Sequence, residues 1–193
     1  MKEIIRAAVK DSISVKKRFF EKNLDSVVNG AQIIAACLAS GHKLLVFGNG
    51  GSAADAQHMA AEFVNRFRIE RPPLSAIALT TDTSVITSIG NDYSFDDLFS
   101  KQISALGKRD DIAVGISTSG NSANVVKAIE TARNIGLFTI GFSGSGGKLA
   151  QSADLSFCVD SGVTARIQEV HITLIHVLCD LAERTLFPGS DIL

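Results

Sequence analysis

The chain has 193 residues, a formal net charge of −1 and a sequence pI near 6.4. A chain of this length can bury the core of one domain. Its balanced charge argues against a nucleic-acid-binding protein, which needs an excess of Lys and Arg to meet the phosphate backbone. No basic cluster is present that would attract an anionic membrane surface.

The N-terminal residues and the cysteines indicate the compartment. The first twelve residues scatter charges through MKEIIRAAVKDS and contain no apolar core of a signal peptide. No apolar run approaches the about 20 residues that span a bilayer. Cys37, Cys158 and Cys179 are widely spaced and form no C-x-x-C pair, so we interpret them as buried free thiols. We therefore expect a cytoplasmic protein.

Residues 1–40 are predicted to form two amphipathic helices, over 3–20 and 25–39. Apolar residues recur there at helical spacing. These helices carry more apolar surface than a solvated arm requires. Because such an appendage packs on another subunit, we expect residues 1–40 to form the contacts of a homo-oligomer.

Residues 41–193 are predicted to form a three-layer α/β/α sandwich with a five-stranded, mostly parallel sheet. Short, nearly continuous apolar runs are typical of strands covered on both faces, and helical stretches separate them. The expected strands are 44–47, 76–79, 112–116, 138–142 and 155–159, and the expected helices are 53–67, 94–106, 122–135 and 163–187. We expect a single α/β domain over residues 1–193, with an N-terminal helical extension.

Two loops that follow predicted strands are rich in small and hydroxyl-bearing residues. The first is Gly48-Asn49-Gly50-Gly51-Ser52, and the second is Ser117-Thr118-Ser119-Gly120-Asn121-Ser122. Ligands of parallel sheets bind at the carboxyl ends of the strands, where loops lead into helix N-termini. Glycines admit an anion close to backbone N–H groups, hydroxyls add donors, and the helix terminus adds partial positive charge. These loops therefore predict a phosphate site.

Other interpretations of the loops carry less weight. Ser and Asn are common helix caps, but one cap needs one hydroxyl and the second loop offers four. Neither loop has the Lys of a Walker A sequence, which argues against nucleoside triphosphate hydrolysis. The first loop also resembles a dinucleotide fingerprint, yet the nearby acid after the second predicted strand is Asp82, about thirty residues on rather than the about 20 expected for the ribose contact.

His58 and Glu62 are four residues apart on a predicted helix, so they share one face about one turn from each other. This spacing suits a shared divalent metal or an acid–base pair. The alternative is a surface His–Glu contact worth a few tenths of a kcal/mol.

The last long helix is apolar on two sides, so its polar residues need buried partners. Gln168 and His176 lie on the same side, two turns and ~12 Å apart along the axis. They could meet one ion only if both side chains leaned toward it. His171 lies off that face but is closer to Gln168, so geometry leaves His171 and His176 as rivals.

Four stretches resemble the sugar-isomerase (SIS) fold family along nearly the whole chain: GNGGSAADAQHMAAEF, SIGNDYSFDDLFSKQ, GISTSGNSANVVKAI and ARIQEVHITLIH. Within that family they are similar to enzymes that convert sedoheptulose 7-phosphate to D-glycero-D-manno-heptose 7-phosphate. That reaction is the first step toward ADP-heptose and the lipopolysaccharide core. The resemblance also implies a homotetramer with active sites at subunit contacts.

The resemblance implies roles for particular residues. Ser117, Thr118, Ser119 and Ser122 would hold the phosphate. The rest of the substrate would meet Asn49, Gly50, Gly51, Ser52, Asn91, Asp92 and Gln168. One zinc ion per subunit would be bound by His58, Glu62, Gln168 and His176, which selects His176 over His171.

The implied reaction takes a proton from C1 and delivers one to C2 through a cis-enediol, which a carboxylate and an imidazole can do. We assign Glu62 as the base and His176 as its acid partner. The rival is a phosphosugar-binding member of the family that associates with a replication initiator. NRF-x-x-ERP and LCDL-x-x-x-TLFP resemble it, but this chain keeps Glu62 and His176. Another rival is an isomerase of a hexose or pentose phosphate.

Overall fold

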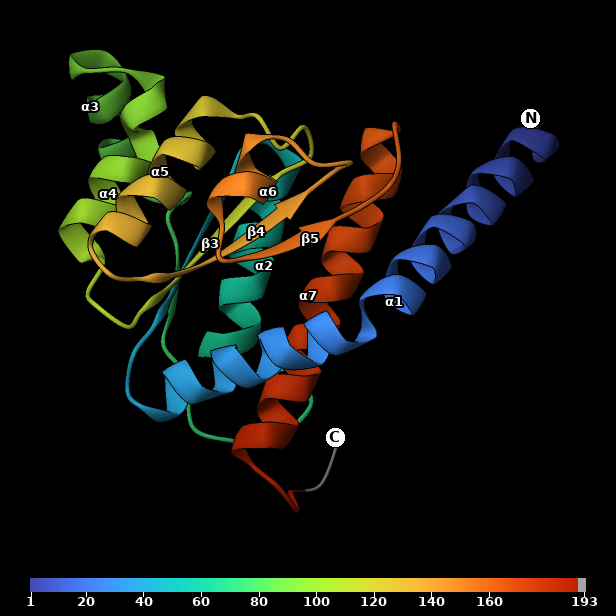
Figure 1. Cartoon of the computed structure of the whole chain (residues 1–193), viewed down its shortest axis with the longest axis horizontal. Helices are drawn as coiled ribbons and strands as arrows, with labels where there is room; N and C mark the ends of the chain where they lie inside the picture. Colours follow the sequence, from blue (N-terminus) through green and yellow to red (C-terminus); the bar gives the residue numbers. More distant parts are fainter. Residues whose placement is uncertain (191–193) are drawn as a thin grey trace.

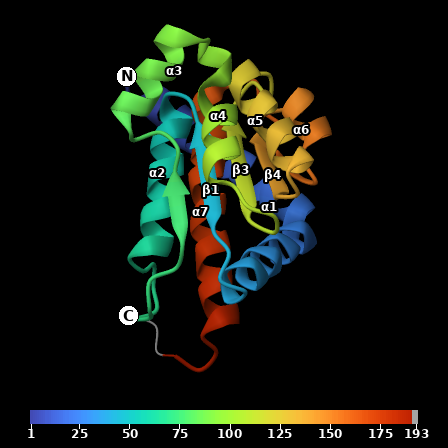
Figure 2. The ribbon, with the colours of Figure 1, turned by 90° about the vertical axis from the view of Figure 1, so that its left-hand side faces the viewer.

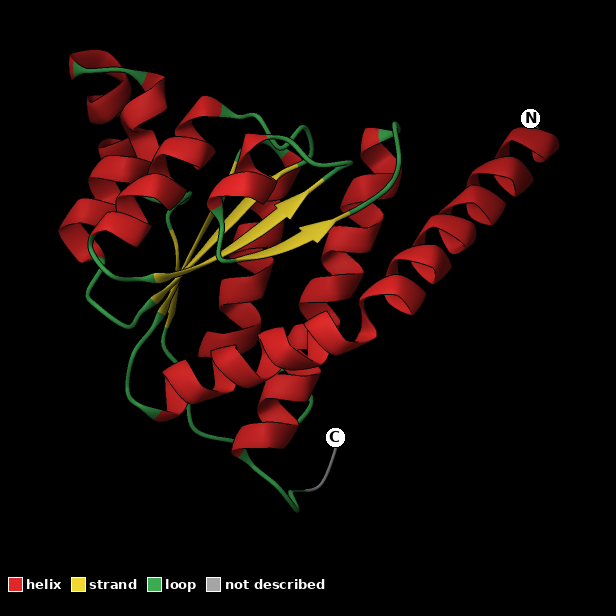
Figure 3. Ribbon diagram, in the orientation of Figure 1, coloured by secondary structure: helices red, strands yellow, loops and turns green. Residues whose placement is uncertain are grey.

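The computed structural model describes residues 1–190. Five parallel strands form one sheet in the order β2-β1-β3-β4-β5, with helices on both faces (Figures 1 and 3). In chain order the elements are α1 (Lys2–Ala39), β1 (Leu44–Gly48), α2 (Gly51–Val64), β2 (Ala76–Ala78), α3 (Thr83–Asp92), the 3-10 helix η1 (Phe95–Asp97), α4 (Leu98–Leu106), β3 (Ile112–Ser117), α5 (Ala123–Asn134), β4 (Phe138–Ser143), α6 (Lys148–Ser152), β5 (Leu155–Cys158) and α7 (Thr164–Leu186).

Alternating side chains along the strands supply two cores, one on each face of the sheet. In β1, Leu44 and Val46 pack in the core with α1, α2 and α7. Leu45 and Phe47 pack in the other core, with residues of α3, α4, α5 and α6. Because successive strand side chains point to opposite faces, a strand covered on both sides must be apolar at every position. The predicted three-layer α/β/α sandwich with a parallel sheet is confirmed.

Two short helices were not predicted. α6 has five residues, too few for a helical period to stand out in the sequence. α3 reads TSVITSIGND, which is rich in β-branched residues and weak in helix formers. Its start is fixed by Asp82, whose side chain accepts a hydrogen bond from the Val85 N–H at 3.0 Å. The predicted helix 94–106 is η1 followed by α4.

The N-terminal residues form α1, whose two halves meet at a kink. Asn23 there has non-helical φ and ψ of −121° and 16°, and its amide donates to the Phe19 carbonyl at 2.7 Å. The second half crosses α7, and Phe19, at the end of the first half, packs on Phe157 of β5. Toward the N-terminus the first half extends away from the sheet (Figure 1). Ile5 and Ile13 on that first half are 63% and 62% exposed. Among residues 1–190, no helix has the combination of length and apolarity needed to cross a bilayer.

All three cysteines are free, but the prediction that all are buried is wrong for one of them. Cys37 and Cys179 are buried, and Cys158 is exposed. β5 is an edge strand in which Phe157 faces the core, so its neighbour Cys158 points the other way.

A buried ion pair connects α7 to the segment that follows α2. The Glu183 carboxylate accepts backbone N–H groups of Phe67, Arg68 and Ile69 at 2.8, 2.9 and 3.0 Å. It also accepts the Arg71 Nε–H at 2.9 Å. Burial opposes ionisation of Glu183, but the three N–H groups and Arg71 outweigh it and hold its pKa below the ordinary value. Glu183 is therefore a buried carboxylate with its charge fully compensated.

The Arg71 guanidinium closes the C-terminal end of α2. Its Nη2 donates to the Glu62 carbonyl at 2.8 Å, and its Nη1 donates to the Phe63 carbonyl at 2.7 Å. Carbonyls in the last turn of a helix lack intrahelical partners. Arg71 supplies those partners, so the end of α2 that carries Glu62 is fixed to the same ion pair.

His171 lies in the core against β4. Its Nε2 is 3.1 Å from the Ser143 carbonyl oxygen, so Nε2 carries the proton. Its ring packs on Phe142 with a centroid separation of 5.7 Å. Burial lowers the pKa of His171 to about 4, with the Ser143 contact opposing that shift.

This buried imidazole predicts a loss of stability in acid. The pKa of His171 is about 4 in the folded chain, and the ordinary value is 6.5. Between these pH values His171 is therefore protonated in the unfolded chain and neutral in the folded chain. The free energy of unfolding therefore falls as pH drops from 6.5 toward 4, by up to about 1.4 kcal/mol per pH unit from this residue. Urea titrations at pH 7, 6 and 5 should show a steeper decline for the wild type than for His171→Gln, and parallel declines would contradict this account.

Candidate active site

The two Ser/Gly-rich loops are neighbours at the carboxyl edge of the sheet. β1 and β3 pair directly, with Gly48 beside Ile116, so the loops that follow them start side by side (Figure 2). From β1 the chain builds β2 on one side, and β3, β4 and β5 on the other. This reversal is a topological switch point, where open α/β sheets bind their ligands.

The first loop is fastened to the start of α5 by a pair of side-chain amides. Asn49 donates to Asn124 at 2.9 Å, and Asn124 donates back to Asn49 at 3.0 Å. Asn124 is buried, so its amide needs this partner. The pair connects the loop after β1 with the helix that follows the second loop.

Gly50 and Gly51 turn the chain from β1 into α2. Gly50 adopts φ +56° with ψ −121°, a backbone conformation that favours glycine. At Gly51, a Cβ would lie 2.2 Å from the Gln168 Nε2, so a side chain there would displace the amide of α7. Gln168 therefore lies directly against the first loop, while Ser52 is buried in the first turn of α2.

The second loop gathers its hydroxyl groups. The Ser117 Oγ lies 2.9 Å from the Ser122 Oγ and 3.3 Å from the Ser119 Oγ. Ser122 is the N-cap of α5 but makes no side-chain capping hydrogen bond. The backbone carbonyl of Thr118 accepts a hydrogen bond from the Gly144 N–H at 3.1 Å, and the Thr118 hydroxyl takes no part in that bond. Hydroxyls at the N-terminus of α5 are suited to bind an anion.

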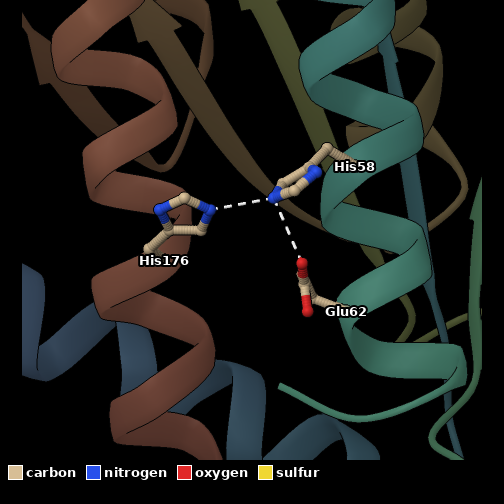
Figure 4. A group of neighbouring side chains, drawn as sticks. All are labelled: His58, Glu62 and His176. Atoms are coloured by element: carbon tan, nitrogen blue, oxygen red, sulfur yellow. Dashed lines mark hydrogen bonds and ion pairs between the residues drawn. The ribbon is translucent and has the colours of Figure 1, made fainter. Parts of the chain in front are cut away.

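His58 and Glu62 of α2 meet His176 of α7 (Figure 4). The His58 Nε2 lies 3.1 Å from Glu62 Oε1 and 2.8 Å from the His176 Nε2. A nitrogen–nitrogen contact this short requires one of the two rings to donate a proton to the other. The side chains of His58 and Glu62 are 42% and 20% exposed, so the group is open to a ligand.

These three residues fit a divalent metal. One ligand atom from each lies within 4.8 Å of the others. Two imidazoles and one carboxylate are a ligand set of catalytic zinc, which keeps a further position for water or substrate. Around a tetrahedral ion the two nitrogens would lie about 3.3 Å apart, so a small widening of their present contact would admit it.

The environment of His176 lowers its pKa. Burial is the main cause, the charge of His58 adds to it, and Glu62 opposes it. The ring of Phe67 stacks on the His176 ring, with centroids 5.4 Å apart and planes inclined by 14°. His176 is thus a neutral imidazole at neutral pH, held between His58 and an aromatic ring.

The other predicted residues lie away from this group. Gly51, which Gln168 contacts, precedes His58 by seven residues, about 10 Å along α2. Gln168 could join the ligand set only by turning from Gly51 toward His58. Asn91 and Asp92 are exposed at the end of α3, where Asn91 donates to Asp92 at 2.7 Å. The rival histidine, His171, bonds to β4.

Sequence reasoning missed three residues of this region. Asn124 and Phe67 contact predicted site residues, and only the fold brings them there. Asp55, one turn before His58, has a buried Oδ2 with no hydrogen-bond partner in residues 1–190. Burial raises the pKa of Asp55 to about 6, although the charge of His58 opposes this. Its i, i+3 spacing to His58 was the available signal.

One cavity lies away from these loops. Its volume is about 680 Å³, and Ile112 and Phe138, the first residues of β3 and β4, line it. It therefore opens at the amino edge of the sheet, opposite the switch point. We assign the site by its chemical groups, because none of the candidate site residues lines this cavity.

Comparison with known proteins gives consistent matches. The SIS domain family matches residues 9–144. The phosphoheptose isomerase of Nitratidesulfovibrio vulgaris strain Hildenborough is 60% identical over 185 residues, covering 95% of this chain and 88% of the relative. The phosphoheptose isomerase of Aquifex aeolicus is 53% identical over 191 residues, covering 98% of this chain and 100% of the relative. The structure of the Neisseria gonorrhoeae phosphoheptose isomerase matches with a TM-score of 0.89 at 46% identity, covering 94% of this chain and 98% of that one.

A second solved structure extends this agreement. A phosphoheptose isomerase from Francisella tularensis matches with a TM-score of 0.91 at 39% identity, covering 94% of this chain and 97% of that one. Sequence and fold thus agree over nearly the full length of several enzymes of one kind. The chain is an isomerase that belongs to the SIS-domain family and, within it, to the phosphoheptose isomerases.

Proposed function

We propose that the chain converts sedoheptulose 7-phosphate to D-glycero-D-manno-heptose 7-phosphate, as the first step toward ADP-heptose and the lipopolysaccharide core. The observation that carries this proposal is the meeting of His58 and Glu62 of α2 with His176 of α7. The helix that supplies the first two begins at the Gly-rich loop, beside the hydroxyl-rich loop. An acid–base group and an anion-binding loop are the two parts that isomerisation of a sugar phosphate requires.

In this proposal the substrate phosphate binds to Ser117, Thr118, Ser119 and Ser122 at the start of α5. The cluster of hydroxyl groups and the helix N-terminus support that role. The sugar hydroxyls are met by the remaining predicted residues, which are Asn49, Gly50, Gly51, Ser52, Asn91, Asp92 and Gln168. Because Asn49 is held by Asn124, its amide is oriented before substrate arrives.

The same proposal gives Glu62 and His176 the proton transfers. Glu62 takes the proton from C1 and passes it to O2, which converts the ketose to a cis-enediol. Its Oε1 faces His58, so Oε2 is the oxygen available for the transfer. His176, a neutral imidazole with one donor and one acceptor nitrogen, delivers a proton to C2 and takes the proton of O1, so both residues return to their starting states. The aldose product results, with no net gain or loss of protons.

We propose one zinc ion per subunit, bound by His58, Glu62 and His176, with Gln168 as a fourth ligand. When bound, zinc would polarise the oxygens at C1 and C2 and stabilise the charge of the enediolate. The support is the convergence of the three ligand atoms. For Gln168 the support is the family resemblance alone.

Replacement of either proton-transfer residue tests the assignment. Glu62→Gln and His176→Gln should each lower kcat on sedoheptulose 7-phosphate by ~10²–10⁴-fold, because each removes one acid–base group. Glu21→Gln, at an exposed carboxylate of α1, should leave kcat unchanged. Product formation can be followed by NMR. If wild-type protein supplied with zinc gave no heptose phosphate, a phosphosugar-binding role would replace this proposal. If Glu62→Gln kept normal turnover, Glu62 would not be the base.

Removal and return of zinc tests the metal proposal. Dialysis against a chelator should abolish activity, and one equivalent of zinc should restore it, with elemental analysis of both samples. Zinc should also raise the melting temperature of the wild type, because a ligand that binds only the folded state stabilises it. His58→Ala should lose that thermal shift. Full activity in protein shown to be metal-free would remove zinc from the mechanism.

We propose a homotetramer, in which the exposed apolar residues on the first half of α1 pack on other copies of the chain. Ile4, Ile5 and Ile13 present an apolar surface there that no other part of residues 1–190 covers. Light scattering should give four chains of 20.4 kDa. The double variant Ile5→Asp, Ile13→Asp should dissociate, whereas Ser14→Asp on the same helix should not. A single-chain mass for the wild type would contradict the proposal.

A further inference from the structure

The imidazole of His176 stacks on a residue that lies outside both helices of the site. Phe67 lies between α2 and β2, and its ring stacks on His176 at 5.4 Å with an inclination of 14°. The torsion that turns a histidine ring about its Cβ–Cγ bond is broad, so backbone and rotamer alone leave the ring plane loosely defined. A stacked aromatic ring restricts that torsion. It therefore helps to keep the His176 Nε2 aimed at His58, a contact between the two histidines that Figure 4 shows.

Phe67 is itself held in place by α7. Its backbone N–H donates to Glu183 Oε1 at 2.8 Å, and the N–H groups of Arg68 and Ile69 donate to Oε2. Glu183 follows His176 by seven residues, so both lie on one face of α7 two turns apart. The helix that carries His176 thus also carries Glu183, whose carboxylate holds the backbone of Phe67 next to the His176 ring.

Arg71 joins this arrangement to Glu62. Its guanidinium is buried, pairs with Glu183 at 2.9 Å and donates to the Glu62 carbonyl at 2.8 Å. The backbone that carries Glu62 and the ring that stacks on His176 are therefore anchored at one ion pair. A shift of that segment would move the two proposed proton-transfer residues relative to each other.

We propose that Phe67 is a positioning residue, which fixes the ring plane of His176 and is itself fixed by the Arg71–Glu183 pair. This inference rests on the proposed function, in which His176 transfers a proton. A packing role alone would require only apolar volume at position 67. Positioning requires an aromatic plane, so the two roles differ in which substitutions they tolerate.

Phe67→Leu, Phe67→Met and Phe67→Tyr separate these roles. Leu and Met keep apolar volume without a ring, and Tyr keeps the ring. We expect kcat to fall about 10–10²-fold in the first two, since small misplacements of reacting groups have effects of that order, while KM stays near the wild-type value. Phe67→Tyr should restore kcat. The melting temperature of each variant shows whether it folds. If Phe67→Leu does not fold, Phe67→Met provides the test.

A second readout needs neither metal nor turnover. In metal-free protein labelled at histidine rings, the His176 signals, identified by their loss in His176→Gln, should lie upfield because of the Phe67 ring current. They should move downfield in Phe67→Leu and stay in Phe67→Tyr, while the His171 signals remain unchanged. An unmoved His176 signal in Phe67→Leu, or unchanged kcat in that variant, would overturn the inference. Full activity of His176→Gln would instead overturn the proposed function, and the ring signals would still report whether Phe67 orients His176.

Discussion

The carboxylate of Glu183 and the guanidinium of Arg71 are both buried, and much of the site depends on how their charges are compensated. Two charges removed from water cost several kcal/mol each unless their remaining hydrogen-bonding positions are filled. Here three backbone N–H groups and Arg71 donate hydrogen bonds to the Glu183 carboxylate. Backbone carbonyls at the end of α2 and in the next residues accept hydrogen bonds from the Arg71 guanidinium. The pair therefore specifies one arrangement of α2, the following segment and α7.

That arrangement sets the register between α2 and α7. Gly51 contacts Gln168, and seven residues further along α2, His58 contacts His176, eight residues further along α7. The two helices thus run side by side in the same direction from the switch point toward the ion pair. One end of their seam lies at the two loops proposed to hold the phosphate, and the proposed acid–base group lies farther along it. This separation matches a substrate whose phosphate and carbonyl are at opposite ends of a carbon chain.

Features that depend on local spacing could be predicted from the sequence. Continuous apolar runs gave the strands, composition gave both loops, and the i, i+4 interval placed His58 beside Glu62. Features that depend on the orientation of α7 about its own axis could not be predicted from local spacing. His171 and His176 are five residues apart on a helix that is apolar on two sides, so spacing left them as rivals and only the family resemblance selected His176. The fold shows the physical reason, because His171 bonds to β4 and His176 faces His58. The contacts of Phe67 and Asn124 join segments distant in sequence, and no local pattern predicts them.

The central claim is that one substrate spans the hydroxyl-rich loop and the group formed by His58, Glu62 and His176. A crystal structure of the zinc-loaded protein with sedoheptulose 7-phosphate, recorded with anomalous data at the zinc edge, tests this most directly. The account predicts one zinc peak per chain between those three side chains. It also predicts the phosphate on Ser117, Thr118, Ser119 and Ser122, with C1 and C2 facing Glu62 and His176. A phosphate bound elsewhere, or a sugar whose C1 and C2 lie away from Glu62, would contradict it.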